Sequence, residues 1–328
     1  MVPVKKISPS QINTFNTCQM QWFLSYILGY RTPSGKAALL GSAAHKVLEG
    51  VALCKLHHQG ESAKTDKVLG RIGKKLKLEE WKEKSFAHYK KESKGLLEDS
   101  DFKILNSHVE STVDNPYFPF NLEVVAAEQY FIIDVEKPWA RYSYPSDSGV
   151  ESGTLKINGV IDLVFRGDDG KLCYMDYKFG KLRDWATGKE KNYDTLHEDV
   201  QLCIYYWAIR QLLKEEEVFP YIWYAAQGKM FSLTFDESQL KLAEQTLQSI
   251  FLQMKAIVEP KCNYSYRCKW CDFSTAKFSN YGKDKMDLEW SDKCHFPSTD
   301  NKSVMCDSMA KLFRHRSINL ILENMKYV

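Results

Sequence analysis

Asp162, Asp176 and Lys178 are the residues whose types and spacing point most directly to chemistry. Two runs of strand-forming residues flank the turn Asp168-Asp169-Gly170, which predicts a hairpin with a three-residue loop and its glycine in the left-handed conformation. In that register Asp162 lies directly opposite Asp176, with Cβ atoms about 5 Å apart, and Lys178 shares their face. The hairpin therefore places two carboxylates and one amine on one surface, a set that could bind a divalent cation.

The surroundings of the two aspartates distinguish two interpretations of this set. Like charges placed opposite each other destabilise a sheet. Either a divalent cation with oxygen ligands offsets them, or both are solvated on an exposed face with Lys178 as their salt-bridge partner. Apolar residues surround both aspartates, as in Val160-Ile161 and Tyr174-Met175. Such strands are typically covered on both faces, and a buried carboxylate needs a compensating partner, so we favour the metal site.

The cysteines form a second candidate group. The chain has nine cysteines, and an odd number without a secretory signal argues against a disulfide scaffold. Three of them, Cys262, Cys268 and Cys271, lie within ten residues of a polar, aromatic stretch. Packing gives little reason to collect thiols there, so the spacing indicates a metal site.

Length and composition describe an ordinary globular chain. Its 328 residues are 44% hydrophobic and 27% charged, which excludes a disordered or fibrous protein and leaves one large domain or two modest ones. The formal net charge of +3 is too small to identify a polyanionic partner. The apolar runs are shorter than a membrane span, and the polar N-terminus has no secretory signal, so we expect a cytoplasmic protein with no membrane partner.

Helical and strand-like periods alternate along the chain and must position these groups. We expect helices over 9–28, 36–56, 199–213 and 237–258, and strands over 124–133, 155–165, 171–179 and, as a hairpin, 219–235. No G-x-x-x-x-G-K-[ST] phosphate loop is present, so we expect no nucleotide triphosphate site.

A basic segment lies between the second helix and the first long strand. From Lys64 to Lys94 there are eleven Lys and Arg residues against five Asp and Glu residues. The segment is either a solvated helical face or an insertion that contacts phosphates. We expect it to form part of a basic helical insertion over 57–120 within a domain over 1–275, followed by a C-terminal extension over 276–328.

The hairpin and four further segments resemble a known family. Gly159-Val160-Ile161-Asp162 followed by Asp176-Tyr177-Lys178 resembles the core of the PD-(D/E)XK nucleases, in the RecB-like branch that includes phage-type exonucleases, AddB nuclease domains and CRISPR-associated iron–sulfur exonucleases. The other segments follow the order of the family's motifs from Ser8 to Phe273: Ser8-Pro9-Ser10-Gln11-Ile12 before Cys18, Gly41-Ser42-Ala43-Ala44-His45, Gln201 with Tyr205, and Cys268-Lys269-Trp270-Cys271-Asp272-Phe273.

The resemblance implies an α/β fold with a restriction-endonuclease-like core. That core is a mixed central β-sheet flanked by helices, here with a helical insertion and a cysteine-rich C-terminal region. It also implies that His45, Asp162 and Asp176 hold one or two Mg²⁺ or Mn²⁺ ions, with the Tyr177 carbonyl as a further ligand. Gly41, one turn before His45, would permit close approach of a neighbouring element.

The resemblance assigns roles to the remaining polar residues. Lys178 would orient the attacking water or neutralise charge in the transition state, and as a proton acceptor it would need a lowered pKa. Gln201 and Tyr205 would position the DNA backbone, against the alternative of ordinary helix packing. Glu128, in the strand before the hairpin, is either an outer metal ligand or a surface glutamate.

Many members of this branch bind a [4Fe–4S] cluster through one N-terminal and three C-terminal cysteines. Cys18 fits the first position, and Cys268 with Cys271 fits the C-x-x-C pair. The family's last cysteine is missing at its usual distance, so the fourth ligand would be Cys262 or the distant Cys294. A zinc ion on the same residues, or a site that has lost its metal, are the alternatives.

The expected function is therefore a metal-dependent DNA exonuclease that acts on single-stranded DNA or free DNA ends in recombination, replication or DNA processing. The alternatives are a catalytically silent DNA-binding or scaffold module, a nuclease subunit that depends on a partner, and a nuclease of RNA or branched structures. The presence of His45, Asp162, Asp176 and Lys178 favours an enzyme. The sequence predicts no particular oligomeric state.

Overall fold

The computed structural model describes residues 3–27, 35–59, 78–115, 118, 122–146, 149–183, 189–257, 260–261, 263 and 271. Its contacts divide the chain into two units, which are taken separately below. One consists of Met1–Pro33, Ile133–Asn158 and Thr246–Val328, and the other of Ser34–Ile132 and Gly159–Gln245. The predicted domain boundaries at 275 and 276 stay a prediction, because the extension 276–328 lies outside the described residues.

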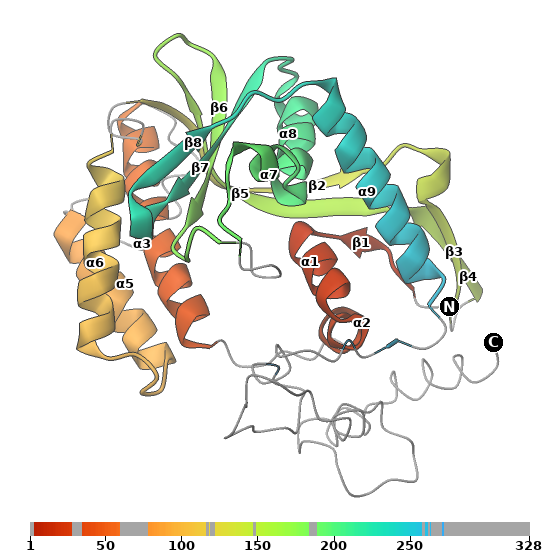
Figure 1. Cartoon of the computed structure of the whole chain (residues 1–328), viewed down its shortest axis with the longest axis horizontal. Helices are drawn as coiled ribbons and strands as arrows, with labels where there is room; N and C mark the ends of the chain where they lie inside the picture. The colour runs from red at the N-terminus through yellow and green to blue at the C-terminus, as the bar shows by residue number, and fades with distance from the viewer. Residues whose placement is uncertain are drawn as a thin grey trace, which may run out of the picture. The chain divides into compact units, whose positions relative to one another are not determined.

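A mixed β-sheet is the scaffold of the second unit (Figure 1). Strand β5 (Lys156–Arg166) pairs antiparallel with β6 (Leu172–Lys178), β6 pairs in parallel with β7 (Val218–Tyr224), and β7 pairs antiparallel with β8 (Lys229–Ser232). Strand β2 (Glu123–Asp134) also pairs with β5. Strands β2 and β5 contribute residues to both units. The predicted strands and their order along the chain are confirmed.

The β5–β6 hairpin has the predicted register. Leu163 pairs with Met175, and the ladder runs from there to the turn. The Gly167 N–H donates to the Lys171 carbonyl over 2.9 Å, which leaves a three-residue loop, and Gly170 has φ of +75°. A left-handed residue at the end of a three-residue loop is the geometry that glycine supplies without steric cost.

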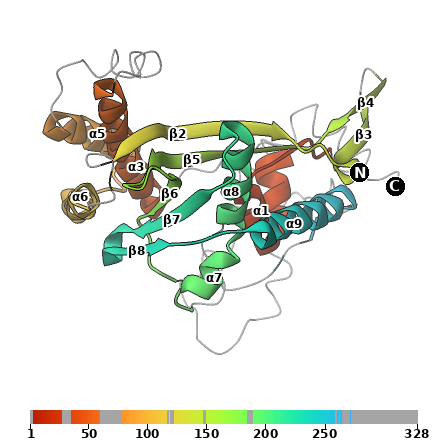
Figure 2. The ribbon, with the colours of Figure 1, turned by 90° about the horizontal axis from the view of Figure 1, so that it is seen from above.

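Helices cover both faces of this sheet (Figures 1 and 2). Alternate residues of β6, including Met175 and Tyr177, enter a hydrophobic core with α3 (Lys36–His58), α5 (Leu78–Glu92) and α6 (Asp99–Val113). On the other face, the Tyr174 hydroxyl donates to the Leu202 carbonyl of α8 (Val200–Leu213) over 2.6 Å. The predicted fold class, a mixed sheet flanked by helices, is confirmed.

Helix α3 is long and apolar enough, by length and composition, to cross a membrane over Lys36–Leu56. Length and composition alone do not make such a helix a membrane span. The core helix of a soluble protein passes the same test, and Ala44, Val47 and Val51 of α3 are buried in the hydrophobic core of this unit. The helix is therefore weak evidence for a membrane span.

The packing of α5 on α3 depends on Gly50. A Cβ atom placed on Gly50 would lie 1.8 Å from Nε1 of Trp81, whose indole N–H donates to the Lys46 carbonyl over 3.2 Å. The missing side chain therefore lets the indole of α5 lie directly on the backbone of α3. This contact fixes where the rest of α5 lies along α3.

We expect Gly50→Ala to destabilise the protein by about 1–3 kcal/mol, because the added methyl group must displace the indole ring. Urea unfolding monitored by circular dichroism measures the effect. The matched control is Gly41→Ala on the same helix, where an added Cβ meets nothing within 4 Å and better helix propensity should raise stability by up to about 1 kcal/mol. Equal stability of the two variants would show that the Trp81 contact is not a tight one.

The first unit begins with β1 (Lys6–Ile7), which pairs in parallel with Lys156 and Ile157. Helix α1 (Pro9–Thr17) has the predicted start, with Pro9 in its first turn and the Ser8 hydroxyl accepting from the Gln11 N–H over 3.3 Å. The prediction of one continuous helix to residue 28 is wrong.

The break in that helix falls at Cys18, which has an extended backbone with φ of −162°. The chain then continues as α2 (Gln19–Trp22) and the π-helix Phe23–Ile27. Helical spacing of apolar residues on both sides of position 18 concealed the break. The hairpin of β3 (Arg141–Ser146) and β4 (Gly149–Thr154) was also missed, because its strands are polar and largely exposed.

The remaining elements are three short ones and one long helix. They are the 3₁₀ turns Pro138–Ala140 and Ala225–Gln227, helix α7 (Tyr193–His197) and the long helix α9 (Glu237–Lys255), which runs from the second unit into the first. The predicted basic insertion contains α5 and α6, while residues 60–77 of it lie outside the described residues.

Candidate active site

Three side chains from three elements of the second unit converge on one point. His45 of α3, Glu128 of β2 and Asp162 of β5 each offer a ligand atom, and these atoms all lie within 4.8 Å of one another. One imidazole and two carboxylates form a ligand set that suits Mg²⁺ or Mn²⁺, as well as other divalent ions. The set is therefore a candidate metal centre.

His45 is held between the two carboxylates. Its Nδ1 lies 3.4 Å from Asp162 Oδ1 and 3.6 Å from Glu128 Oε1. Burial by itself lowers the pKa of His45, but the charges and hydrogen bonds of the two carboxylates outweigh burial and raise the pKa to about 10. A cation is therefore favoured at this point, and a bound metal ion would take the place of the imidazolium proton.

Glu128 reaches the site through an irregularity in β2. Its φ of +45° lies in the left-handed region, which is unusual for a residue other than glycine. Ala127 packs against the core that contains α3, and Glu128, the next residue, contacts His45 of that same helix. Two consecutive residues directed to one side interrupt the alternation of a strand, as in a bulge that redirects a side chain.

The structure also decides the environment of Glu128. Its side chain is 29% exposed, and burial raises the pKa of its carboxyl, with Asp162 adding to the increase and His45 opposing it. Glu128 is therefore partly buried beside His45, and its role as an outer metal ligand stays a prediction. The alternation of side chains along a strand does not predict the direction of the Glu128 side chain, because residue 128 has an irregular backbone.

Asp162 links the metal centre to the hairpin. While Oδ1 faces His45, Oδ2 accepts the backbone N–H of Tyr177 over 2.7 Å. Asp162 is 9% exposed and Asp176 is 2% exposed. The interpretation of the two aspartates as a solvated surface pair is therefore wrong.

Burial and charged neighbours act on Asp176 in opposite directions. Burial raises the pKa of its carboxyl to about 6, with Asp162 adding to the increase, while the Lys178 ammonium lowers it. The ammonium lies 2.7 Å from Asp176 Oδ2, and the Gln201 side-chain amide donates to Oδ1 over 2.9 Å. A cation on the Asp162 side would further favour the carboxylate.

Lys178 is held as a cation. Burial lowers the pKa of Lys178, but Asp176 more than compensates, so that the pKa is raised above its usual value. The idea that Lys178 accepts a proton required a lowered pKa and is not supported by this environment. The ammonium is suited to orient a ligand and to neutralise negative charge.

Gln201 connects the acid, the amine and a tyrosine. Its carbonyl oxygen accepts from Lys178 over 3.2 Å, and its amide nitrogen donates to the Tyr205 hydroxyl over 3.0 Å as well as to Asp176. The start of α8 is fixed by Asp199, whose carboxylate accepts the backbone N–H of Gln201 over 3.0 Å. Gln201 and Tyr205 are therefore hydrogen-bonded to the candidate site residues and are not packed by apolar contacts alone.

The structure thus brings seven of the predicted site residues into one connected group: His45, Glu128, Asp162, Asp176, Lys178, Gln201 and Tyr205. Tyr177 contributes its backbone N–H, while its ring packs edge-on near the His45 ring at a centroid distance of 5.9 Å. The reason given for Gly41 is not supported, because among the residues that the structure describes no neighbouring atom lies within 4 Å of the position of a Cβ.

The cysteine candidates lie in the first unit and are described only in part. Cys18, at the break after α1, accepts the backbone N–H of Asn263 on its Sγ over 3.5 Å, and the Asn263 side-chain amide donates to the Thr17 carbonyl. The Met20 N–H donates to the Lys261 carbonyl over 3.0 Å. Cys271 is partly buried, whereas Cys262, Cys268 and Cys294 lie outside the described residues.

Comparison with known proteins identifies the family. The chain matches the model of the PD-(D/E)XK nuclease superfamily over residues 6–276, and it belongs to that superfamily. It is a nuclease by class, and nucleases of this superfamily usually use divalent metal ions. A search of curated proteins finds no match.

Solved structures also match the chain. A protein from Eubacterium rectale, described as a candidate exonuclease, matches with a TM-score of 0.51 and 13% identity, over 87% of this chain and 91% of that one. This likeness supports the fold. The structure of SSO0001 matches over 71% of this chain and 90% of that one with 18% identity, but its TM-score of 0.25 is too low to indicate a shared fold.

Proposed function

We propose that this protein is a metal-dependent DNA exonuclease of the RecB-like branch, which uses Mg²⁺ or Mn²⁺ and acts on single-stranded DNA or free DNA ends. The observation that carries the proposal is the convergence of His45, Glu128 and Asp162 beside the buried Asp176–Lys178 pair. Its place would be the cytoplasm, in recombination, replication or DNA processing.

The residues fit a divalent metal ion because their charges are otherwise unbalanced. His45, Glu128 and Asp162 would hold the ion, and Asp176 with the Tyr177 carbonyl would complete its surroundings. When bound, the ion would activate the attacking water and stabilise charge on the phosphate oxygens. In the hydrolysis, the water oxygen forms a bond to phosphorus, and the bond from phosphorus to the leaving sugar oxygen breaks.

The protein groups beside this centre orient the reacting atoms. The Lys178 ammonium would face the attacking water or a phosphate oxygen and neutralise the charge that develops there. Gln201 holds Lys178 and Asp176 in one arrangement through its two amide atoms, and so it acts as a positioning residue. Tyr205 in turn fixes the Gln201 amide.

The test of the proposal is degradation of linear DNA labelled at one end, single-stranded and double-stranded, with Mg²⁺, Mn²⁺ or a chelator. We expect metal-dependent loss of DNA that the chelator abolishes and that the Asp162→Ala/Asp176→Ala double variant lacks. Circularised DNA of the same sequence separates exonuclease from endonuclease action, because a circle offers no end.

Failure of the folded protein to degrade any of these substrates with either metal would contradict the proposal. That result would favour the alternative function, a DNA-binding or scaffold module on the same fold. Cutting of circular DNA at the same rate would keep the nuclease but reject the dependence on ends.

We further propose that Cys18 and C-terminal cysteines hold a [4Fe–4S] cluster, with zinc as the alternative metal. Cys268 and Cys271 would supply two ligands, and Cys262 or Cys294 the fourth. The fit rests on Cys18, whose sulfur receives a backbone N–H from Asn263, one residue beyond Cys262. A donor aimed at a sulfur suits a ligating thiolate. The group would join the first helix to the C-terminal segment.

We expect Cys18→Ser to remove bound iron or zinc and to lower the melting temperature, since the metal would be part of the folded state. Elemental analysis and the visible absorption of anaerobically purified protein measure the metal. Cys54→Ser is the matched control, because that partly buried thiol lies on α3 in the other unit. Purified parent protein that holds neither iron nor zinc would reject this part of the proposal.

A further inference from the structure

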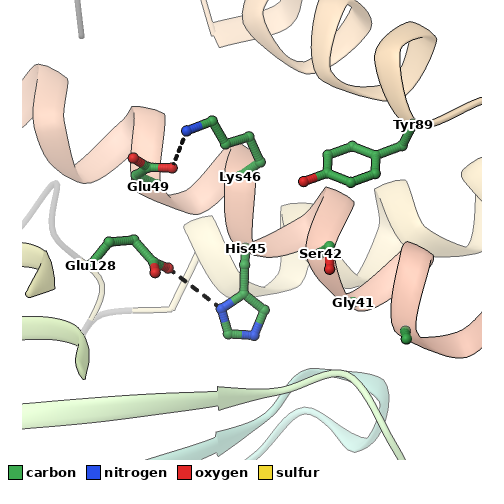
Figure 3. A pocket seen from close by; sticks show the side chains of 8 residues that line it. Gly41, Ser42, His45, Lys46, Glu49, Tyr89 and Glu128 are labelled. Atoms are coloured by element: carbon green, nitrogen blue, oxygen red, sulfur yellow. Dashed lines mark hydrogen bonds and ion pairs between the residues drawn. The ribbon is translucent and has the colours of Figure 1, made fainter. Parts of the chain in front are cut away.

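A cavity of about 440 Å³ opens beside the metal centre, on the face of α3 that points away from the core. Gly41, Ser42, His45, Lys46 and Glu49 line it from α3, at positions one helical turn apart (Figure 3). Tyr89 of α5 and Glu128 of β2 line its two sides. His45 and Glu128 thus belong both to the metal centre and to this cavity.

Gly41 leaves room in this cavity that the described residues do not fill. A Cβ at Gly41 would meet no atom of the described part of the chain within 4 Å, whereas at Gly50 on the same helix it would collide with Trp81. A glycine inside a helix costs about 1 kcal/mol relative to alanine. Packing against the described residues therefore does not require a glycine at position 41. The glycine instead leaves open space next to His45.

Tyr89 of α5 lines the same space from across α3. It stands two helical turns after Trp81 on α5, on the side that faces α3, and its ring is half-buried against the core. The Trp81–Gly50 contact sets the position of α5 and with it the position of this ring. An aromatic face at the edge of a nucleic-acid site is a stacking platform for an unpaired base.

Lys46 adds the charge that a nucleic-acid backbone requires. Its ammonium lies 2.5 Å from Glu49 Oε2, and the side chain of Lys46 is 40% exposed. A phosphate at the mouth of the cavity could therefore take the place of Glu49 as the partner of this ammonium. The Ser42 hydroxyl lies between Lys46 and Gly41 along the helix and offers a donor to the same ligand.

We propose that this cavity is a nucleotide subsite that takes one unpaired nucleotide next to the scissile phosphate. The base would lie on Tyr89, the sugar over Gly41, and a backbone phosphate near Ser42 and Lys46. The volume is at the lower end of the range for small-molecule sites, about 300–1,000 Å³, so it suits one nucleotide and not a base pair. The inference rests on the proposed function and narrows its substrate class to single-stranded DNA.

Stacking can be measured without cleavage. We use the Asp176→Ala protein and a short single-stranded oligonucleotide that carries 2-aminopurine, whose fluorescence changes when the base stacks on an aromatic ring. We expect a change at one position of the oligonucleotide, which Tyr89→Phe preserves and Tyr89→Leu removes. The leucine variant keeps the apolar packing of the helix but lacks the ring.

Substitutions that fill the cavity test the proposal independently of base stacking. Gly41→Leu should weaken binding of the single strand at least 10-fold while the melting temperature stays equal or rises, because leucine is the better helix former. Gly41→Ala should give a smaller loss. A blunt duplex of the same sequence should show no 2-aminopurine signal in any variant.

The inference is overturned if Gly41→Leu and Tyr89→Leu bind the single strand as tightly as their parent, or if the duplex gives the same fluorescence change. In the otherwise unmodified enzyme, Gly41→Leu should raise KM for single-stranded DNA at least 10-fold. Parent protein that cuts no DNA with either metal rejects the proposed function, whereas cutting with unchanged KM in Gly41→Leu rejects only the subsite.

Discussion

The Asp176→Ala protein should lose DNA cleavage by a factor of about 1,000 or more while it still binds DNA. Asp176 is 2% exposed, and its carboxylate is held by Lys178 on one oxygen and by Gln201 on the other. A short side chain cannot replace this preoriented ligand for a metal ion. Removal of the buried anion relieves its own burial cost but leaves the Lys178 ammonium without this partner, so thermal unfolding of the variant is measured alongside cleavage.

The measurement compares single-turnover cleavage of labelled DNA with DNA affinity, and calorimetry reports the metal affinity. We expect metal binding to weaken together with cleavage, and DNA affinity to stay within about 3-fold of the parent. Glu198→Ala is the control, because it removes a carboxylate just before the start of α8 that does not belong to the proposed site. Cleavage at the parent rate in Asp176→Ala would remove this residue from the proposed site.

Lys178→Met should lower cleavage by about 100-fold to 1,000-fold without a comparable loss of metal binding. The methionine keeps most of the length of the chain but lacks the ammonium that would neutralise charge in the transition state. It also removes the cation that lowers the pKa of Asp176. That pKa should rise above about 6, and the residual activity should therefore reach its plateau at higher pH than in the parent.

The pH profile of single-turnover cleavage distinguishes this role from a merely structural one. A structural defect would lower the rate by the same factor at every pH, whereas loss of the ammonium should shift the acidic limb upward. Lys191→Met, which removes an ammonium that pairs with Asp199 at the start of α8, is the matched control. A parent-like rate and profile in Lys178→Met would contradict the assigned role.

The local rules of the chain were enough to predict the catalytic hairpin. The three-residue turn with Gly170 sets the register, and a strand pair separated by so few residues has no other low-energy pairing. The same holds for the start of α1 at Ser8 and for the i, i+4 placement of Gln201 and Tyr205 on α8, which depend on neighbours within one or two helical turns.

The position of Glu128 in the metal centre was left open by the sequence. A bulge in β2 turns its side chain toward α3, and the strand period alone does not predict a bulge. The break of the first helix at Cys18 was missed for a related reason. The Cys18 sulfur accepts the Asn263 N–H and the Met20 N–H donates to the Lys261 carbonyl, so the break is tied to a segment more than 240 residues away along the chain.

The sequence by itself determined the class of the protein, the hairpin with its two aspartates and lysine, and the helices beside it, because these follow from short-range patterns and from the ordered motifs. Only the tertiary structure decided that both aspartates are buried, that Lys178 stays a cation, and that Gly41 opens a cavity. These properties depend on burial and on charges contributed by elements distant in the chain, which no local pattern records.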